Sequence, residues 1–171
     1  KPISNLGDSL FLKAVGKGNL FMIPIPVLLF ILVFIIFLFL LQKTTFGRHI
    51  YATGSNATAA RLAGVNIERT KRIAYALSGA MASLSGLILL SRLSSAQPTL
   101  GQGYELDAIA AVALGGTSMN GGRGKIWGTF IGVLIIAVLN NGLNILGVSS
   151  YYQDVVKGIV ILIAVLSDRR R

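Results

Sequence analysis

Few residues in this sequence have side chains suited to catalysis or metal binding. His49 is the only histidine and there is no cysteine, so a histidine or thiolate cluster for a metal ion is excluded. Glu105 and Asp107 form a pair of carboxylates, as acid–base catalysis would need, but no nucleophile lies near them in the sequence. Capping of a helix by Asp107 is the interpretation that we favour. The sequence therefore indicates no enzyme active site.

The glycine-dense stretch at residues 115–128 is a second candidate, because glycine-rich loops bind phosphate groups. It does not match the phosphate-loop pattern G-x-x-x-x-G-K-[ST], since Ile126 follows Gly124-Lys125 and Met119 occupies the position of the first glycine. The dinucleotide pattern G-x-G-x-x-G is also missing. We therefore expect a glycine-rich turn, no bound cofactor and no ATP hydrolysis by the usual route.

Asn140, Asn141 and Asn144 lie in an otherwise apolar segment. Amides inside a membrane span are costly unless they bond to each other, to a neighbouring helix or to a polar solute. Asn140 and Asn144 are four residues apart and share one face of a helix. The hydroxyl groups of a sugar would satisfy both the donor and the acceptor of such amides, whereas hydrogen bonds between helices are the alternative. These three residues are our candidates for a translocation path.

Composition places the chain in a lipid bilayer. Of its 171 residues 53% are hydrophobic and only 13% are charged, against about 25% in a soluble domain, and the mean hydropathy is +0.71. The net charge of +10 would suggest nucleic acid in a soluble protein. Here the excess of Lys and Arg is better explained by loops on the cytoplasmic side of a membrane. We therefore expect membrane lipid, and no nucleic acid, as a partner.

Apolar segments predict membrane helices at residues 22–41, 73–90, 126–146 and 155–166. Residues 108–116 form a half-span that runs into the glycine turn, as in a broken or re-entrant helix. Gly128 and Gly132 give the third span a close packing face, and residues 9–14 are compatible with a short surface helix. The sequence starts at Lys1. We expect an all-α, polytopic transmembrane bundle, with residues 1–171 as part of one longer transmembrane domain.

A short helix is predicted inside the basic loop at residues 42–72. Ser55 or Asn56 can cap it, and Gly64 can end it. Counting Lys and Arg gives eleven in this loop, the glycine turn and the C-terminal tail, against four in residues 1–21 and 91–107. The short helix and the C-terminus are therefore expected on the cytoplasmic side.

Several long stretches resemble the C-terminal half of the monosaccharide permeases of bacterial ABC importers, the ribose permeases in particular. The resemblance covers most of residues 47–166. It rests on residues 47–52 (GRHIYA), 56–65 (NATAARLAGV), 92–98 (RLSSAQP), 103–116 (GYELDAIAAVALGG) and 140–153 (NNGLNILGVSSYYQ).

The resemblance implies a multi-pass protein of the bacterial inner membrane that is not itself an enzyme. Its implied partners are a second permease copy, an ABC ATPase subunit and a periplasmic or extracellular sugar-binding protein. It also implies a coupling helix that sits in a groove of the ATPase. The matching residues here are Asn56, Ala59, Ala60, Arg61 and Gly64.

Two other classes of protein remain open. A secondary transporter or channel with a discontinuous helix would explain the half-span at 108–116, but not the cytoplasmic helix. An ion-coupled carrier also usually needs an intramembrane carboxylate, and none lies between the ends of a predicted full span. A membrane enzyme is the weakest alternative, because no catalytic cluster is present.

Overall fold

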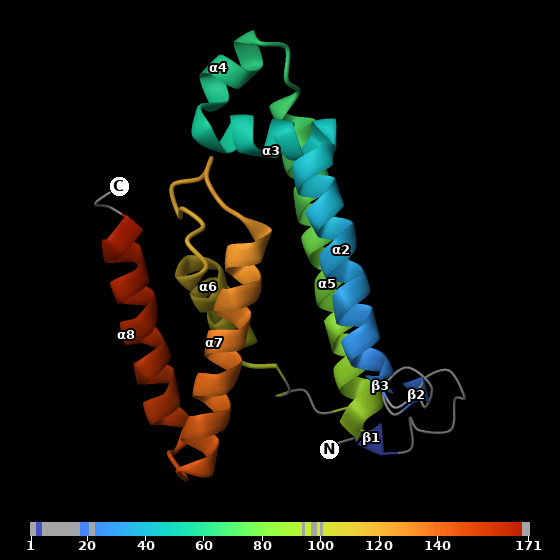
Figure 1. Ribbon diagram of the computed structural model, residues 1–171, viewed down its shortest axis with the longest axis vertical. Helices are drawn as coiled ribbons and strands as arrows, with labels where there is room; N and C mark the ends of the chain where they lie inside the picture. The colour runs from blue at the N-terminus through green and yellow to red at the C-terminus, as the bar shows by residue number, and fades with distance from the viewer. Residues whose placement is uncertain are drawn as a thin grey trace. The chain divides into compact units, whose positions relative to one another are not determined.

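The computed structural model describes residues 3–4, 18–20, 23–93, 95–96, 99 and 101–168. Seven helices account for most of this part of the chain (Figure 1). The short helix expected at residues 9–14 lies outside the described residues. The chain divides into two compact units, Lys1–Phe46 with Glu68–Gly101, and Gly47–Ile67 with Gln102–Arg171.

The first unit contains the long helices α2 (Ile25–Lys43) and α5 (Ile67–Leu93), the latter from Glu68 onward. Pro24 caps α2 in an extended conformation, and a proline in the first turn costs the helix no hydrogen bond. Two-residue strands form two antiparallel pairs, β1 (Ile3–Ser4) with β4 (Ser95–Ala96) and β2 (Asn19–Leu20) with β3 (Ile23–Pro24). Because these pairs are only two residues long, the described part of the unit consists mainly of helix.

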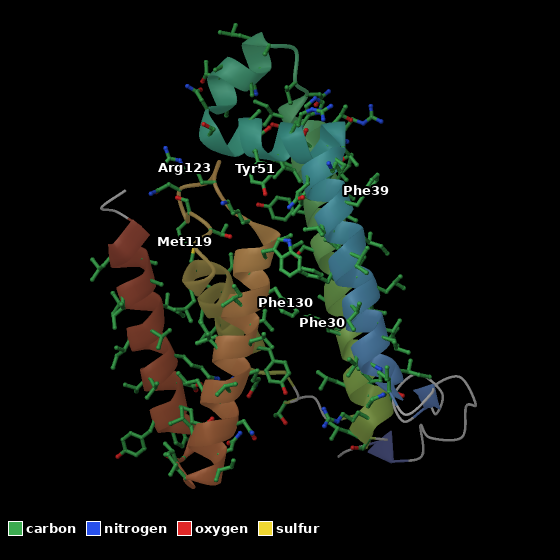
Figure 2. All side chains as sticks on the ribbon, viewed as in Figure 1. Phe30, Phe39, Tyr51, Met119, Arg123 and Phe130 are labelled. Atoms are coloured by element: carbon green, nitrogen blue, oxygen red, sulfur yellow. The ribbon has the colours of Figure 1, made fainter. Side chains whose placement is uncertain are left out.

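Three helices are long and apolar enough to cross a membrane: α2, α5 and α7 (Ile126–Ile145). Their mean hydropathies are 3.1, 1.8 and 1.8. No residue of α2 is buried, and Phe30 and Phe39, labelled in Figure 2, are 44% and 64% exposed. Such a continuous apolar surface is stable in lipid and not in water. The prediction of an all-α membrane bundle is confirmed.

The second unit packs α6 (Tyr104–Leu114), α7 and α8 (Ser150–Asp168) together. Ala110 and Ala111 of α6 and Ile136 of α7 form its core, with Leu114, Val160 and Ile161 packed against them. Helices α6 and α8 run in the same direction, and α7, which lies between them in the sequence, runs in the opposite direction (Figure 1). As a result, the turn after α6 and the end of α8 lie at the same end of this unit.

Helices α6 and α7 approach each other at their backbones. A Cβ atom on Gly132 would overlap the carbonyl oxygen of Ala111, and one on Gly128 would overlap that of Gly115. The packing face predicted for Gly128 and Gly132 is therefore confirmed. Small residues allow such contact in lipid, where van der Waals packing and weak Cα–H···O contacts hold helices together.

Three helices extend beyond the apolar segments that predicted them, whereas α2 begins at Ile25 rather than at residue 22 and α7 ends at Ile145 rather than at residue 146. Helix α6 begins at Tyr104 rather than at residue 108, α5 covers 67–93 rather than 73–90, and α8 covers 150–168 rather than 155–166. An apolar window marks the part of a helix suited to hydrocarbon, whereas backbone hydrogen bonding continues through polar residues at each end. Helix α6 ends at Leu114 and the chain stays non-helical until Lys125.

The contact between α6 and α7 predicts an unusual sensitivity to a single methyl group. Replacing Gly132 with Ala should destabilise the protein by about 2 kcal/mol, because a backbone must move to admit the side chain. The matched control is Gly142→Ala in the same helix, where nothing lies within 4 Å of the added atom. Thermal unfolding in detergent measures both variants. Equal melting temperatures for the two would contradict the close packing.

Candidate functional site

A cluster of polar side chains connects α6, α7 and α8 in the second unit. Asp107 of α6 lies at its centre: its Oδ1 is 2.8 Å from Lys157 Nζ of α8. Asn140 of α7 donates a hydrogen bond through Nδ2 to Asp107 Oδ2 at 3.0 Å. One carboxylate therefore joins all three helices.

The ion pair of this polar cluster is well shielded. The side chain of Lys157 is 10% exposed and that of Asp107 is 21% exposed. A second carboxylate, Asp154, lies 3.6 Å from Lys157 Nζ but is 57% exposed. A charge among apolar helices is costly unless a partner lies close to it, so Lys157 and Asp107 stabilise each other's charged forms.

A second set of bonds in the cluster closes the turn between α7 and α8. Gln153 is buried and donates from Nε2 to Asn144 Oδ1 at 2.9 Å and to the carbonyl oxygen of Val148 at 2.8 Å. Gly147 has a φ of +70°, which lets the chain reverse direction there. The turn is therefore held by side-chain as well as backbone hydrogen bonds.

Asp107 does not cap α6 as the sequence suggested. The N-cap is Gly103, with a φ of 84° and no side-chain hydrogen bond. Asp107 lies one turn inside the helix, too far along for a capping position, and its carboxylate pairs with Lys157 instead. Lys157 was not among our candidate residues. A single lysine within an apolar segment was the signal, because it requires a counter-charge from another helix.

The three asparagines differ in their surroundings. Asn140 is half-buried, and its Oδ1 is buried without a hydrogen-bond partner among the described residues. Asn141 and Asn144 are exposed on the surface of this unit. Hydrogen bonds to Asp107 and Gln153 show that two of the amides join helices of the same chain. A path that Asn140, Asn141 and Asn144 face stays a prediction.

The short helix predicted in the basic loop is present as α4 (Ala57–Leu62). Asn56 caps it, accepting a hydrogen bond from the Ala59 amide at 3.0 Å. At the other end Gly64 has a φ of 84°, and the amides of Gly64 and Val65 donate to the carbonyls of Arg61 and Ala60. This pair of bonds is a Schellman motif, which ends the helix sharply.

The faces of α4 differ in exposure. Ala60 is 5% exposed, whereas Ala59 and Arg61 are exposed. Leu62, the one large apolar side chain of α4, is 85% exposed. Our sequence candidates omitted Leu62, although an apolar residue in a basic loop is itself a sign of a binding surface. The outer face of α4 thus offers small, charged and apolar side chains next to one another.

The described residues offer no group of three or more His, Cys, Asp or Glu side chains that could hold a metal ion. His49 is exposed on α3 (Thr45–Ser55). The polar cluster and α4 are therefore the two candidate functional regions of the described chain.

The ion pair predicts that substituting one partner costs more stability than substituting both partners. Lys157→Met should destabilise the protein by about 3 kcal/mol, because it leaves the Asp107 carboxylate without its counter-charge. The double variant Asp107→Asn with Lys157→Met should regain most of that loss. Asp154→Asn is the control and should change little, since this side chain is largely exposed. Thermal unfolding would contradict the pairing if the double variant were less stable than Lys157→Met alone.

Comparison with known proteins identifies the chain. The family model described as the branched-chain amino acid transport system permease component matches residues 4–165. The ribose import permease protein RbsC of Bacillus subtilis is 58% identical over 170 residues, covering 99% of this chain and 53% of the relative. RbsC of Escherichia coli K12 is 56% identical, covering 91% and 49%. The L-arabinose transport system permease protein AraH of Escherichia coli K12 is 47% identical, covering 91% and 48%.

The chain thus spans about half the length of the curated relatives that it matches. No solved structure matches it. The resemblance that the sequence motifs carried is confirmed, and the matched relatives are transport proteins rather than enzymes. The chain belongs to the permease component family of the branched-chain amino acid transport systems.

Proposed function

We propose that this chain is the C-terminal half of the transmembrane subunit of an ABC importer for a monosaccharide, ribose or a related sugar. The observation that carries the proposal is its 58% identity, over nearly the whole chain, to a protein named as a ribose import permease. The other relatives named above are a second ribose permease and an arabinose permease, all for pentoses. The substrate class follows from this shared chemistry.

The energy for transport comes from a partner. This sequence has no phosphate loop, so an ABC ATPase subunit supplies ATP hydrolysis from the cytoplasmic side. A sugar-binding protein delivers the solute on the other side, and a second permease copy completes the path. The glycine turn and the end of α8 lie at one end of the second unit, as do α3 and α4 (Figure 1). That placement supports a cytoplasmic C-terminus, because it brings basic residues of α3, α4 and the glycine turn to one end of this unit: Arg48, Arg61, Arg123 and Lys125.

Helix α4 is the contact with the ATPase. A soluble ATPase that closes on nucleotide has to push on a rigid body outside the bilayer, and caps at both ends make α4 rigid. Ala59 lets the helix enter a groove, Arg61 offers a charged hydrogen bond and Leu62 offers apolar area. A helix lying on anionic lipid is the alternative, but α4 has one large exposed apolar side chain rather than a continuous apolar face.

The solute path lies along α7. We assign to it the exposed amides of Asn141 and Asn144, and the free acceptor of Asn140. Amide side chains match the mixed donors and acceptors of sugar hydroxyls. On a face of α7 turned toward the second permease copy, such exposed amides would line a path between the two chains.

A secondary transporter with a discontinuous helix is the second candidate, and the end of α6 at Leu114 favours it. Asp107 is a carboxylate among apolar helices, as an ion-coupled carrier would need. However, Lys157 Nζ lies 2.8 Å from its Oδ1 and Asn140 donates to its Oδ2, so both oxygens already have partners. This pairing argues against coupling through a free carboxylate.

Uptake of ribose into liposomes distinguishes the two functions. The full-length permease is reconstituted with the ATPase and the sugar-binding protein, and uptake is followed with and without ATP on the cytoplasmic side. The ABC importer requires ATP and is insensitive to ionophores that dissipate ion gradients. Uptake without ATP that an ionophore abolishes would support the carrier.

In the same liposomes, Ala59→Trp should lower ribose uptake by at least about tenfold, since an indole on the outer face of α4 keeps the helix out of a groove. Co-purification of the ATPase with the permease should fall as well. Ser149→Trp, in the exposed turn between α7 and α8, is the control and should leave ATPase binding intact. Normal uptake by Ala59→Trp would mean that α4 lies elsewhere, for example on lipid.

A further inference from the structure

Helix α3 touches the glycine turn between α6 and α7 through backbone atoms. A Cβ on Gly54 would lie 2.5 Å from the amide nitrogen of Gly122, and a Cβ on Gly121 would lie 2.8 Å from the carbonyl oxygen of Gly54. Side chains do not approach backbone so closely, so neither position accepts one unless the backbone shifts. Two segments far apart in the sequence are thus in direct contact.

A hydrogen bond extends this contact along α3. The hydroxyl of Tyr51 donates to the carbonyl oxygen of Gly124 at 3.1 Å. Figure 2 labels Tyr51 on α3 and Arg123 in the turn. One turn of α3, from Tyr51 to Gly54, therefore faces residues 121–124, and we call this contact the α3–turn joint.

On one side, the joint is fixed to α4. Only Asn56 separates the end of α3 at Ser55 from the start of α4 at Ala57. The amide of Asn56 donates to the carbonyl oxygen of Ala52, while its side chain caps α4. Two hydrogen bonds at a single linking residue leave little freedom between the two helices.

On the other side, the joint is fixed to α6 and α7. The turn is closed by backbone hydrogen bonds from Ser118 to the Arg123 carbonyl and from Gly121 to the Ser118 carbonyl, 2.9 and 3.1 Å long. Immediately below it, Gly115 and Gly128 are in backbone contact. Closely packed elements of this kind move together rather than deform continuously.

We propose that the α3–turn joint transmits the movement of α4 to α6 and α7, so that Gly54 and Tyr51 are positioning residues for transport. This inference rests on the proposed function, because it assumes that an ATPase moves α4. Displacement of α4 carries α3 with it, and the contact of α3 with residues 121–124 carries the displacement into the α6–α7 pair. A flexible turn would lose that displacement, whereas the hydrogen-bonded turn preserves it.

The experiment measures ribose uptake and ATP hydrolysis in the same liposomes, with the full-length permease, the ATPase and the binding protein. Gly54→Ala should lower the number of sugars imported per ATP about tenfold, while the ATPase still co-purifies. Gly158→Ala is the matched control, because nothing lies within 4 Å of the added atom on α8. Its ratio should equal that of the unaltered permease.

Tyr51→Phe is the milder variant, and it tests the α3–turn joint if Gly54→Ala does not fold. It removes only the hydroxyl that bonds to Gly124, and the ratio should fall about threefold. An unchanged ratio in Tyr51→Phe and in any folded Gly54→Ala would overturn the joint, even where the unaltered complex imports ribose with ATP. A complex that imports no ribose with ATP would instead refute the proposed function.

Discussion

A lysine among apolar helices needs a counter-charge from the protein, and Lys157 has it in Asp107. The Lys157 side chain is only 10% exposed, and an unpaired charge costs far more when it is buried than when it lies at a surface. The requirement restricts how α8 can lie against α6, since a rotation of either helix would separate the two groups. Because Asp107 also accepts from Asn140, the same constraint fixes α7. The polar cluster thus specifies one arrangement of three helices whose other contacts are largely small and apolar.

Backbone contact complements this constraint at the other end of the same helices. Ala111, Gly115, Gly128 and Gly132 bring α6 and α7 so close that their orientation is set by shape. Polar bonds fix the end near the α7–α8 turn, and glycine contacts fix the end near the turn at residues 115–125. Helices α6 and α7, held together at both ends, can move as one body. Movement as one body is what a transport subunit needs if a partner outside the bilayer drives it.

Local features were predictable from the sequence, whereas pairings between distant residues were not. Asn56 and Gly64 were recognisable as the ends of a helix because capping depends on residues a few positions apart. The face of Gly128 and Gly132 followed from their spacing along one helix. The pairing of Asp107 with Lys157 depends on which helices become neighbours, and the contact of Gly54 with Gly122 depends on how a loop folds back. Neither leaves a periodic signal in the sequence, so Asp107 was misread as a cap.

The proposed contact between α4 and a partner ATPase is tested most directly by a photocrosslink. Leu62 is the most suitable position, because its side chain is 85% exposed on α4. A photoreactive amino acid placed there in the full-length permease, in a membrane that also contains the ATPase, is irradiated and the products are identified by mass spectrometry. If α4 lies in a groove of the ATPase, Leu62 crosslinks to the ATPase subunit. A crosslink to lipid alone in the assembled complex would contradict the contact between α4 and the ATPase.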